Sequence, residues 1–225
     1  MTAPKKGSLL RELPLLLITA VVASVIVKAF LFQAFYIPSG SMENTLQIND
    51  RVIVNKLGNY LGHVGRGDVV VFVDPGGWLP PAATSTSNSV TTMIKKGLVS
   101  VGLLPDPADQ ALIKRVIGVA GDHVVCCDTK GHLVINGKSI VEPYVAAGNA
   151  PSDMKFDIRV PKSSIWVMGD HRSASEDSRY HQDDPRKGMV PISRIVGRAV
   201  AVVWPFDHIK TLPRPPTLTR IPVVK

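Results

Sequence analysis

The longest apolar stretch of the chain lies within its first forty residues. Apolar side chains run from position 13 to position 37, and the strong interruptions are Lys28 and Gln33. As an α-helix, residues 13–27 would rise about 22 Å, and continuation to position 32 would approach the roughly 30 Å of a hydrocarbon core. The pattern predicts a transmembrane helix over residues 13–35.

The flanks of this stretch favour an anchor that is not cleaved. A cleaved leader has a shorter apolar core and a small-x-small site after it, whereas Phe30, Phe32, Phe35 and Tyr36 follow here. Lys5, Lys6 and Arg11 precede it, so residues 1–12 should remain in the cytoplasm and the rest should lie outside. We therefore expect a single-pass plasma-membrane protein with an extracytoplasmic domain.

Beyond residue 50 the apolar positions occur in short, β-branched runs, which are typical of strands. Asn136-Gly137 lies between two of these runs and is a strong hairpin signal. The pattern predicts a mostly β fold of barrel or sandwich type, with strands near Val52 and Val54 and at 69–73, 112–119, 123–126, 133–135, 139–141, 165–168 and 195–204.

Two regions depart from this pattern. Residues 74–110 are rich in Gly, Pro, Ser and Thr, with a short possible helix at 90–101, and are expected to form an inserted loop. Residues 206–225 are basic and proline-rich. We expect an extended tail there.

Charge and cysteine content exclude several classes of protein. The net charge of +8 is spread along the chain without a basic run interleaved with aromatics, so it favours an anionic membrane surface over nucleic acid. The only two cysteines, Cys126 and Cys127, are adjacent. Neighbouring Cα atoms are about 3.8 Å apart, closer than most disulfides allow, so we interpret the pair as two small strand residues.

Three polar segments are candidates for chemistry. Ser39-Gly40-Ser41 follows the apolar stretch, and a serine needs a base before it can act as a nucleophile; a polar turn is the alternative. Lys114 shares a strand face with apolar neighbours, where desolvation would lower its pKa; an edge strand with snorkelling cations is the alternative. The polar loop at 168–179 follows an apolar strand, and a plain solvated loop is its alternative.

Together these segments resemble the bacterial type I signal peptidases. The matching motifs are Pro-Ser-Gly-Ser-Met at 38–42, Lys-Arg-Val-Ile-Gly at 114–118 and Gly-Asp-x-Arg-x-x-Ser-x-Asp-Ser-Arg at 169–179. Gly121-Asp122 and Asn136-Gly137 also occur in the family's order. The resemblance extends from the anchor to about Trp204, with gaps at 74–110.

The resemblance implies a role for each matching residue. Ser41 would be the nucleophile and Lys114 its general base, without metal or other cofactor. Ser39 would contribute to the oxyanion hole together with the Ser41 N–H, and Ser175 would orient the Lys114 amine. The positions that match the family's substrate pocket are Phe35, Ile37, Met42, Leu46 and Ile113, and those that match structural ion pairs are Asp177, Arg179 and Arg115.

The resemblance also implies an organisation and a substrate. A catalytic core at 36–121 and 166–205 would carry an inserted β-ribbon subdomain at 122–165. The substrates would be preproteins that emerge from the secretion machinery at the bilayer, cut after Ala-x-Ala. Two other functions stay open, namely a membrane-tethered, non-catalytic β-domain that binds partners and a self-cleaving Ser–Lys repressor-type protease.

One position departs from the family pattern. His171 stands where the family commonly has asparagine, which raises a Ser–His alternative. Because Asp170 and His171 are adjacent, their side chains in an extended loop point to opposite sides, so Asp170 is badly placed to orient the ring.

Overall fold

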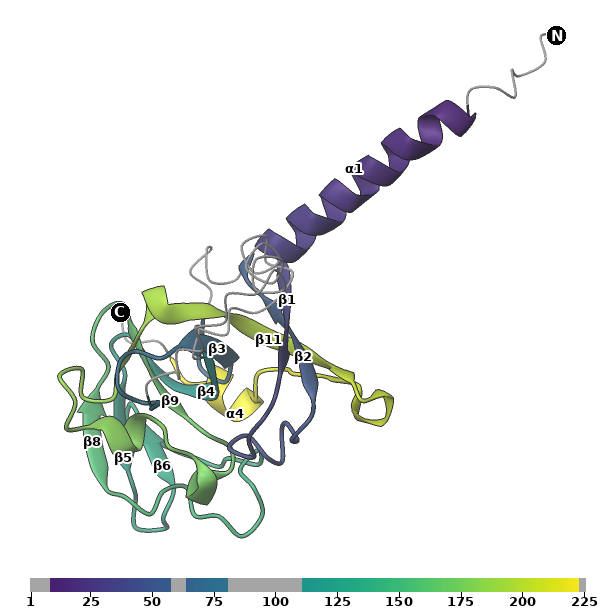
Figure 1. Ribbon diagram of the computed structural model, residues 1–225. Helices are drawn as coiled ribbons and strands as arrows, with labels where there is room; N and C mark the ends of the chain where they lie inside the picture. Colours follow the sequence, from purple (N-terminus) through teal and green to yellow (C-terminus); the bar gives the residue numbers. More distant parts are fainter. Residues whose placement is uncertain (1–8, 58–63, 81–110, 223–225) are drawn as a thin grey trace.

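A computed structural model describes residues 9–57, 64–80 and 111–222, and the molecule is a β-rich body with one projecting helix (Figure 1). The predicted helix at 90–101 and most of the predicted loop at 74–110 lie outside these ranges. The mostly β fold predicted from the sequence is confirmed.

The strands form two sheets. The larger has eight strands in the order β1-β2-β11-β3-β4-β9-β10, with β12 paired to β11, and the smaller has the order β7-β6-β5-β8. The strands of the larger sheet are β1 (Phe32–Tyr36), β2 (Arg51–Asn55), β3 (Val69–Val73), β4 (Ala111–Val119), β9 (Ser164–Met168), β10 (Val190–Pro191), β11 (Ile195–Trp204) and β12 (Lys210–Thr211). Those of the smaller are β5 (His123–Cys126), β6 (Leu133–Ile135), β7 (Lys138–Ile140) and β8 (Phe156–Arg159).

The smaller sheet follows closely from the local sequence. Asn136 and Gly137 both have positive φ, 51° and 76°, as the two-residue turn between β6 and β7 requires. Apolar side chains of this sheet pack with Trp166 and Met168 of β9 in one core. The two sheets are therefore joined by a shared hydrophobic cluster next to β9.

The N-terminal helix α1 covers Leu9–Phe30 and projects from the body (Figure 1). It ends earlier than the predicted boundary at 35, because residues 32–36 pair with β2 in register Phe35↔Val52. The apolar stretch therefore contains a helix followed by an edge strand. Within the described ranges, no helix meets the combination of length and hydropathy that a bilayer crossing requires.

The C-terminal segment is not an extended tail. Residues 210–211 add strand β12, and the short helix α4 (Pro216–Thr219) follows. Leu218 and Ile221 are buried in the core beside the smaller sheet, and the buried Arg66 guanidinium donates to the Ile221 carbonyl at 2.6 Å. This segment is thus packed against the body by apolar and polar contacts.

Cys126 and Cys127 also differ from the sequence interpretation. They form a disulfide across a cis peptide bond, with Cα atoms 3.0 Å apart. The expectation of two small, unlinked strand residues, which assumed the trans Cα spacing of about 3.8 Å, is therefore wrong.

Candidate active site

Ser41 lies in a tight turn directly after β1. The Glu43 N–H donates to the Gly40 carbonyl at 3.0 Å, and the Leu46 N–H donates to the Met42 carbonyl at 2.7 Å. Met42 and Leu46 are fully buried, so their side chains anchor the turn in the hydrophobic core. The backbone that carries the Ser41 side chain is therefore rigidly held.

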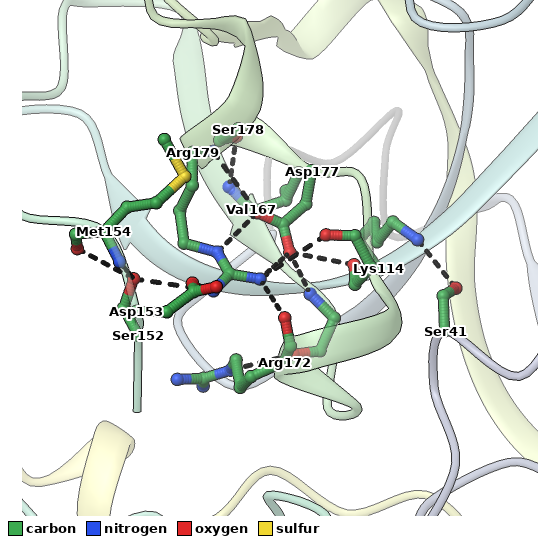
Figure 2. Close-up of polar contacts among 12 residues, drawn as sticks. Ser41, Lys114, Ser152, Asp153, Met154, Val167, Arg172, Asp177, Ser178 and Arg179 are labelled. Atoms are coloured by element: carbon green, nitrogen blue, oxygen red, sulfur yellow. Dashed lines mark hydrogen bonds and ion pairs between the residues drawn. The ribbon is translucent and has the colours of Figure 1, made fainter. Parts of the chain in front are cut away.

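Lys114 lies on β4, which runs between β3 and β9 in the larger sheet. It pairs with Val70 of β3 and directly precedes the segment of β4 that pairs with β9. Its Nζ atom is 2.7 Å from Ser41 Oγ (Figure 2). Because only 3% of Lys114 and 8% of Ser41 is exposed, this contact is shielded from water. The alternative of an edge strand with snorkelling cations is wrong.

Burial changes the acid–base behaviour of this amine. It lowers the pKa of Lys114 to about 8, and the charges around it act in both directions, with Asp177 raising the pKa and Arg179 lowering it. A charged amine is poorly solvated in an apolar strand interior, so the neutral form gains in relative stability. Near neutral pH a usable fraction of Lys114 can therefore accept a proton.

The Ser39 hydroxyl lies close to the Ser41 hydroxyl. The two Oγ atoms are 3.4 Å apart. Since a hydroxyl can donate, Ser39 can contribute a hydrogen bond close to Ser41, where charge would develop during an attack on a carbonyl.

The polar loop after β9 is organised by a buried carboxylate. Asp177 accepts from the Gly169 N–H at 2.9 Å and from Arg179 Nε at 2.8 Å, and neither charged side chain is exposed. The predicted Asp177–Arg179 ion pair is confirmed (Figure 2). A solvated loop, the alternative interpretation, does not describe these residues.

Ser175 lies in this loop but makes a different contact from the predicted one. Its hydroxyl donates to Asp177 Oδ2 at 2.8 Å, and among the hydrogen bonds of the described residues Lys114 is joined to Ser41 instead. Asp177 is the stronger acceptor because it carries a full charge. Ser175 is therefore joined to Asp177, whose charge is one of those that act on the Lys114 amine.

Arg115 pairs with Asp170, not with Asp177. Its Nη2 atom is 2.6 Å from Asp170 Oδ2, with both side chains buried, and the Thr45 hydroxyl also donates to Asp170. Asp170 thereby joins β4 to the turn that carries Ser41. Among the described residues, Asp170 therefore contacts Arg115 and Thr45 and not the His171 ring. This agrees with the expectation that adjacent side chains of an extended loop point to opposite sides.

His171 is near Ser41, but among the hydrogen bonds of the described residues its ring does not contact the Ser41 hydroxyl. The His171 N–H donates to the Ser41 carbonyl at 3.2 Å, and its Nδ1 atom lies 3.2 Å from the Gly40 carbonyl oxygen. The Ser41 hydroxyl bonds Lys114. The geometry therefore favours the Ser–Lys pair over the Ser–His alternative.

A mostly apolar pocket of about 240 Å³ opens beside Ser41 and Lys114. Three of the five positions expected in a substrate pocket line it, namely Phe35, Ile37 and Ile113. Met42 and Leu46 do not, because both are buried in the core beneath. The described residues that line this pocket are Phe35, Tyr36, Ile37, Pro38, Ser39, Ser41, Val71, Leu79, Ala111, Leu112, Ile113 and Lys114.

Gly169 is a site residue that the sequence interpretation did not single out. A Cβ atom built on it would overlap the Ser41 carbonyl oxygen and the Ser175 side chain. Only glycine lets the loop backbone approach the Ser41 turn this closely. Its position between an apolar strand and a polar loop was the available signal.

This arrangement agrees with comparisons to known proteins. The family described as "Signal peptidase, peptidase S26" matches residues 10–204, which include both Ser41 and Lys114. The chain belongs to this family. The resemblance to type I signal peptidases is thereby confirmed.

Several curated relatives carry signal peptidase names. "Signal peptidase I" of Mycobacterium tuberculosis is 36% identical over 90% of this chain and 75% of the relative. "Probable signal peptidase I" of Mycobacterium leprae is 34% identical over 91% and 80%, and "Signal peptidase I T" of Bacillus subtilis is 30% identical over 93% of each. The similarity to signal peptidases thus covers most of every chain compared.

Proposed function

We propose that this chain is a signal peptidase I, a serine endopeptidase that removes signal peptides from translocated preproteins after small residues. The observation that carries this proposal is the buried 2.7 Å contact between Lys114 Nζ and Ser41 Oγ, on an amine whose pKa burial lowers to about 8. A serine with a neutral amine at hydrogen-bonding distance has the base that nucleophilic catalysis requires.

The proposed reaction proceeds through an acyl-enzyme. Neutral Lys114 takes the proton of Ser41 as Oγ attacks the carbonyl carbon, and the oxyanion accepts hydrogen bonds from the Ser41 N–H and the Ser39 hydroxyl. The charged Lys114 then protonates the leaving amine, and the C–N bond breaks. Water, deprotonated by Lys114, hydrolyses the ester and restores both residues.

Strand geometry supports the binding of an extended peptide. Among the described residues, β1 is the last strand of its sheet. β9 pairs with β4 from Arg115 onward, so no described strand pairs with residues 111–114 on that side. Both segments line the pocket beside Ser41. A substrate strand can add to such edges, and a pocket of about 240 Å³ with apolar walls suits small side chains such as alanine.

Attachment to a lipid bilayer through α1 completes the proposal. Seven large apolar side chains of this helix are each more than half exposed. They are Leu13, Leu15, Leu16, Leu17, Ile18, Val21 and Val22. An apolar helix without a protein partner gains stability by burial in lipid. The active site would then lie at the outer membrane face, where preproteins emerge.

The pH dependence of cleavage tests this proposal. With a peptide that contains an Ala-x-Ala site, kcat/KM should rise with pH through an apparent pKa of about 8, because Lys114 must lose its proton to act as the base. The rate should level off above that pH. A stopped assay across pH 6–10 measures the profile.

A matched peptide with leucine in place of the second alanine provides the control, and it should remain uncut. Cleavage that depends on an ionisation near 6.5, the ordinary value for histidine, would instead assign the base to a histidine. Equal cleavage of both peptides would contradict the small-residue specificity.

A further inference from the structure

His171 packs behind the peptide group that carries the Ser41 N–H. Its Nδ1 atom lies 3.2 Å from the Gly40 carbonyl oxygen and 3.0 Å from Glu43 Oε2. Both partners accept hydrogen bonds and neither can donate, so Nδ1 carries a hydrogen whether the ring is neutral or charged. His171 therefore donates to the Gly40 carbonyl, with the Glu43 carboxylate holding the same edge of the ring.

The Gly40 carbonyl and the Ser41 N–H are the two ends of one peptide group. The described cis peptide bonds lie elsewhere in the chain, so this group is trans and its N–H points away from its C=O. The carbonyl oxygen accepts from the Glu43 N–H at 3.0 Å as well as from His171. Two donors thus hold one end of the group, while no hydrogen bond between described residues uses the N–H at its other end.

Donation to the oxygen of an amide changes its N–H in two ways. It polarises the group, which makes the N–H a stronger donor. It also fixes the direction of the N–H before the reaction, and preorganised donors are the ones that stabilise a transition state effectively. The N–H stabilises a substrate carbonyl in the ground state less than the tetrahedral oxyanion, because the carbonyl oxygen carries less negative charge.

The packing around His171 is built for this close approach. A Cβ atom on Gly169 would overlap the Ser41 carbonyl oxygen, and one on Gly40 would lie 2.8 Å from Glu43 Oε1. Gly169 therefore lets the loop approach the Ser41 turn, and Gly40 leaves room for the Glu43 carboxylate. The backbone N–H of His171 adds a second hydrogen bond to the turn, 3.2 Å to the Ser41 carbonyl oxygen.

We propose that His171 is a positioning residue that strengthens the oxyanion hole through the Gly40–Ser41 peptide group, with Glu43 orienting its ring. The inference rests on the proposed function, since it assigns the Ser41 N–H to the oxyanion. It gives a role to the one position where this chain departs from the common family motif.

His171→Leu removes the donor and keeps comparable bulk, and it is expected to lower kcat by about 3- to 10-fold with KM nearly unchanged. His171→Asn can donate through its amide and should recover most of the rate. Affinity for a peptide aldehyde, whose adduct with Ser41 carries the oxyanion, should fall in parallel with kcat. His171→Ala is a second donor-free variant that requires no branched side chain to fit.

His123→Leu serves as the matched control, because His123 lies on β5 and contacts the exposed Asp157; it should leave kcat and aldehyde affinity unchanged. Wild-type protein that fails to cut an Ala-x-Ala peptide would overturn the proposed function itself. Wild-type cleavage combined with wild-type kcat and aldehyde affinity in both donor-free variants would overturn the role of His171 alone. A loss that His171→Asn does not restore would also contradict donation as its cause.

Discussion

Replacing Lys114 by methionine is expected to abolish peptide cleavage and also to raise the free energy of unfolding at pH 7. Cleavage should fall by about 10⁴-fold or more, because Ser41 loses its base. Burial lowers the pKa of Lys114 to about 8, and a shift of this size corresponds to about 3 kcal/mol against the charged form in the folded protein. Part of that is offset by the lost contact with Ser41, so we expect a net gain of about 2 kcal/mol.

The effect of Lys114 on stability should depend on pH in a defined direction. Between pH 8 and pH 10.5 the unfolded chain binds more protons than the folded protein at this residue, so the stability of the wild type rises with pH in this window. The advantage of Lys114→Met should therefore shrink from pH 7 to pH 10. Chemical denaturation of the detergent-solubilised chain, followed by fluorescence of the buried Trp166, measures the difference.

Lys138→Met is the control for this substitution, because Lys138 is an exposed lysine on a strand of the smaller sheet. It should change neither activity nor stability appreciably. A Lys114→Met variant that is less stable than the wild type at pH 7 would show that the folded protein stabilises the charged amine, against the proposed mechanism.

Replacing Asp177 by asparagine should have the largest effect on folding stability. Both Asp177 and Arg179 are fully buried, so the substitution leaves a buried guanidinium charge whose remaining ion-pair partner among the described residues is the mostly exposed Asp153. Breaking a buried pair on one side costs about 3–5 kcal/mol. The thermal unfolding midpoint and the urea midpoint of the detergent-solubilised variant should both fall, and cleavage should fall with them.

Asp153→Asn is a matched control, because Asp153 contacts the same arginine at 3.5 Å but is 62% exposed. That substitution should change stability by less than about 1 kcal/mol. The double variant Asp177→Asn, Arg179→Met should be more stable than Asp177→Asn alone, since it removes the buried charge. Equal losses for Asp153→Asn and Asp177→Asn would contradict the central place of Asp177 in the loop.

Strands could be predicted from the sequence where neighbouring residues alone identify a strand or a turn. The Asn136-Gly137 turn and the run at 69–73 are recognisable from neighbouring residues alone, and both are found. Strand β1 was missed because it lies within the same apolar stretch as α1, which Lys28 and Gln33 interrupt only singly. The docking of residues 206–222 was missed as well, since it depends on Arg66 and on a distant core that no local pattern reveals.

The same distinction applies to the site. Ser41 and Lys114 were found through motif resemblance, but their 2.7 Å contact is between residues 73 positions apart and is formed by the sheet. The partner of Arg115 could not be chosen from the sequence, because Asp170 and Asp177 are equally available along the chain. Ser175 was assigned to Lys114, whereas in the structure its hydroxyl donates to Asp177.

The most direct test of the central claim is to map the cut made in a preprotein. Detergent-solubilised wild-type protein and its Ser41→Ala variant are incubated with a preprotein that carries an Ala-x-Ala site, and the new N-terminus is identified by mass spectrometry. We predict a single cut after the second alanine by the wild type and none by Ser41→Ala. Cleavage that persists in Ser41→Ala, or an intact preprotein after incubation with the wild type, would contradict the assignment of Ser41 and Lys114 as a signal-peptide-cleaving pair.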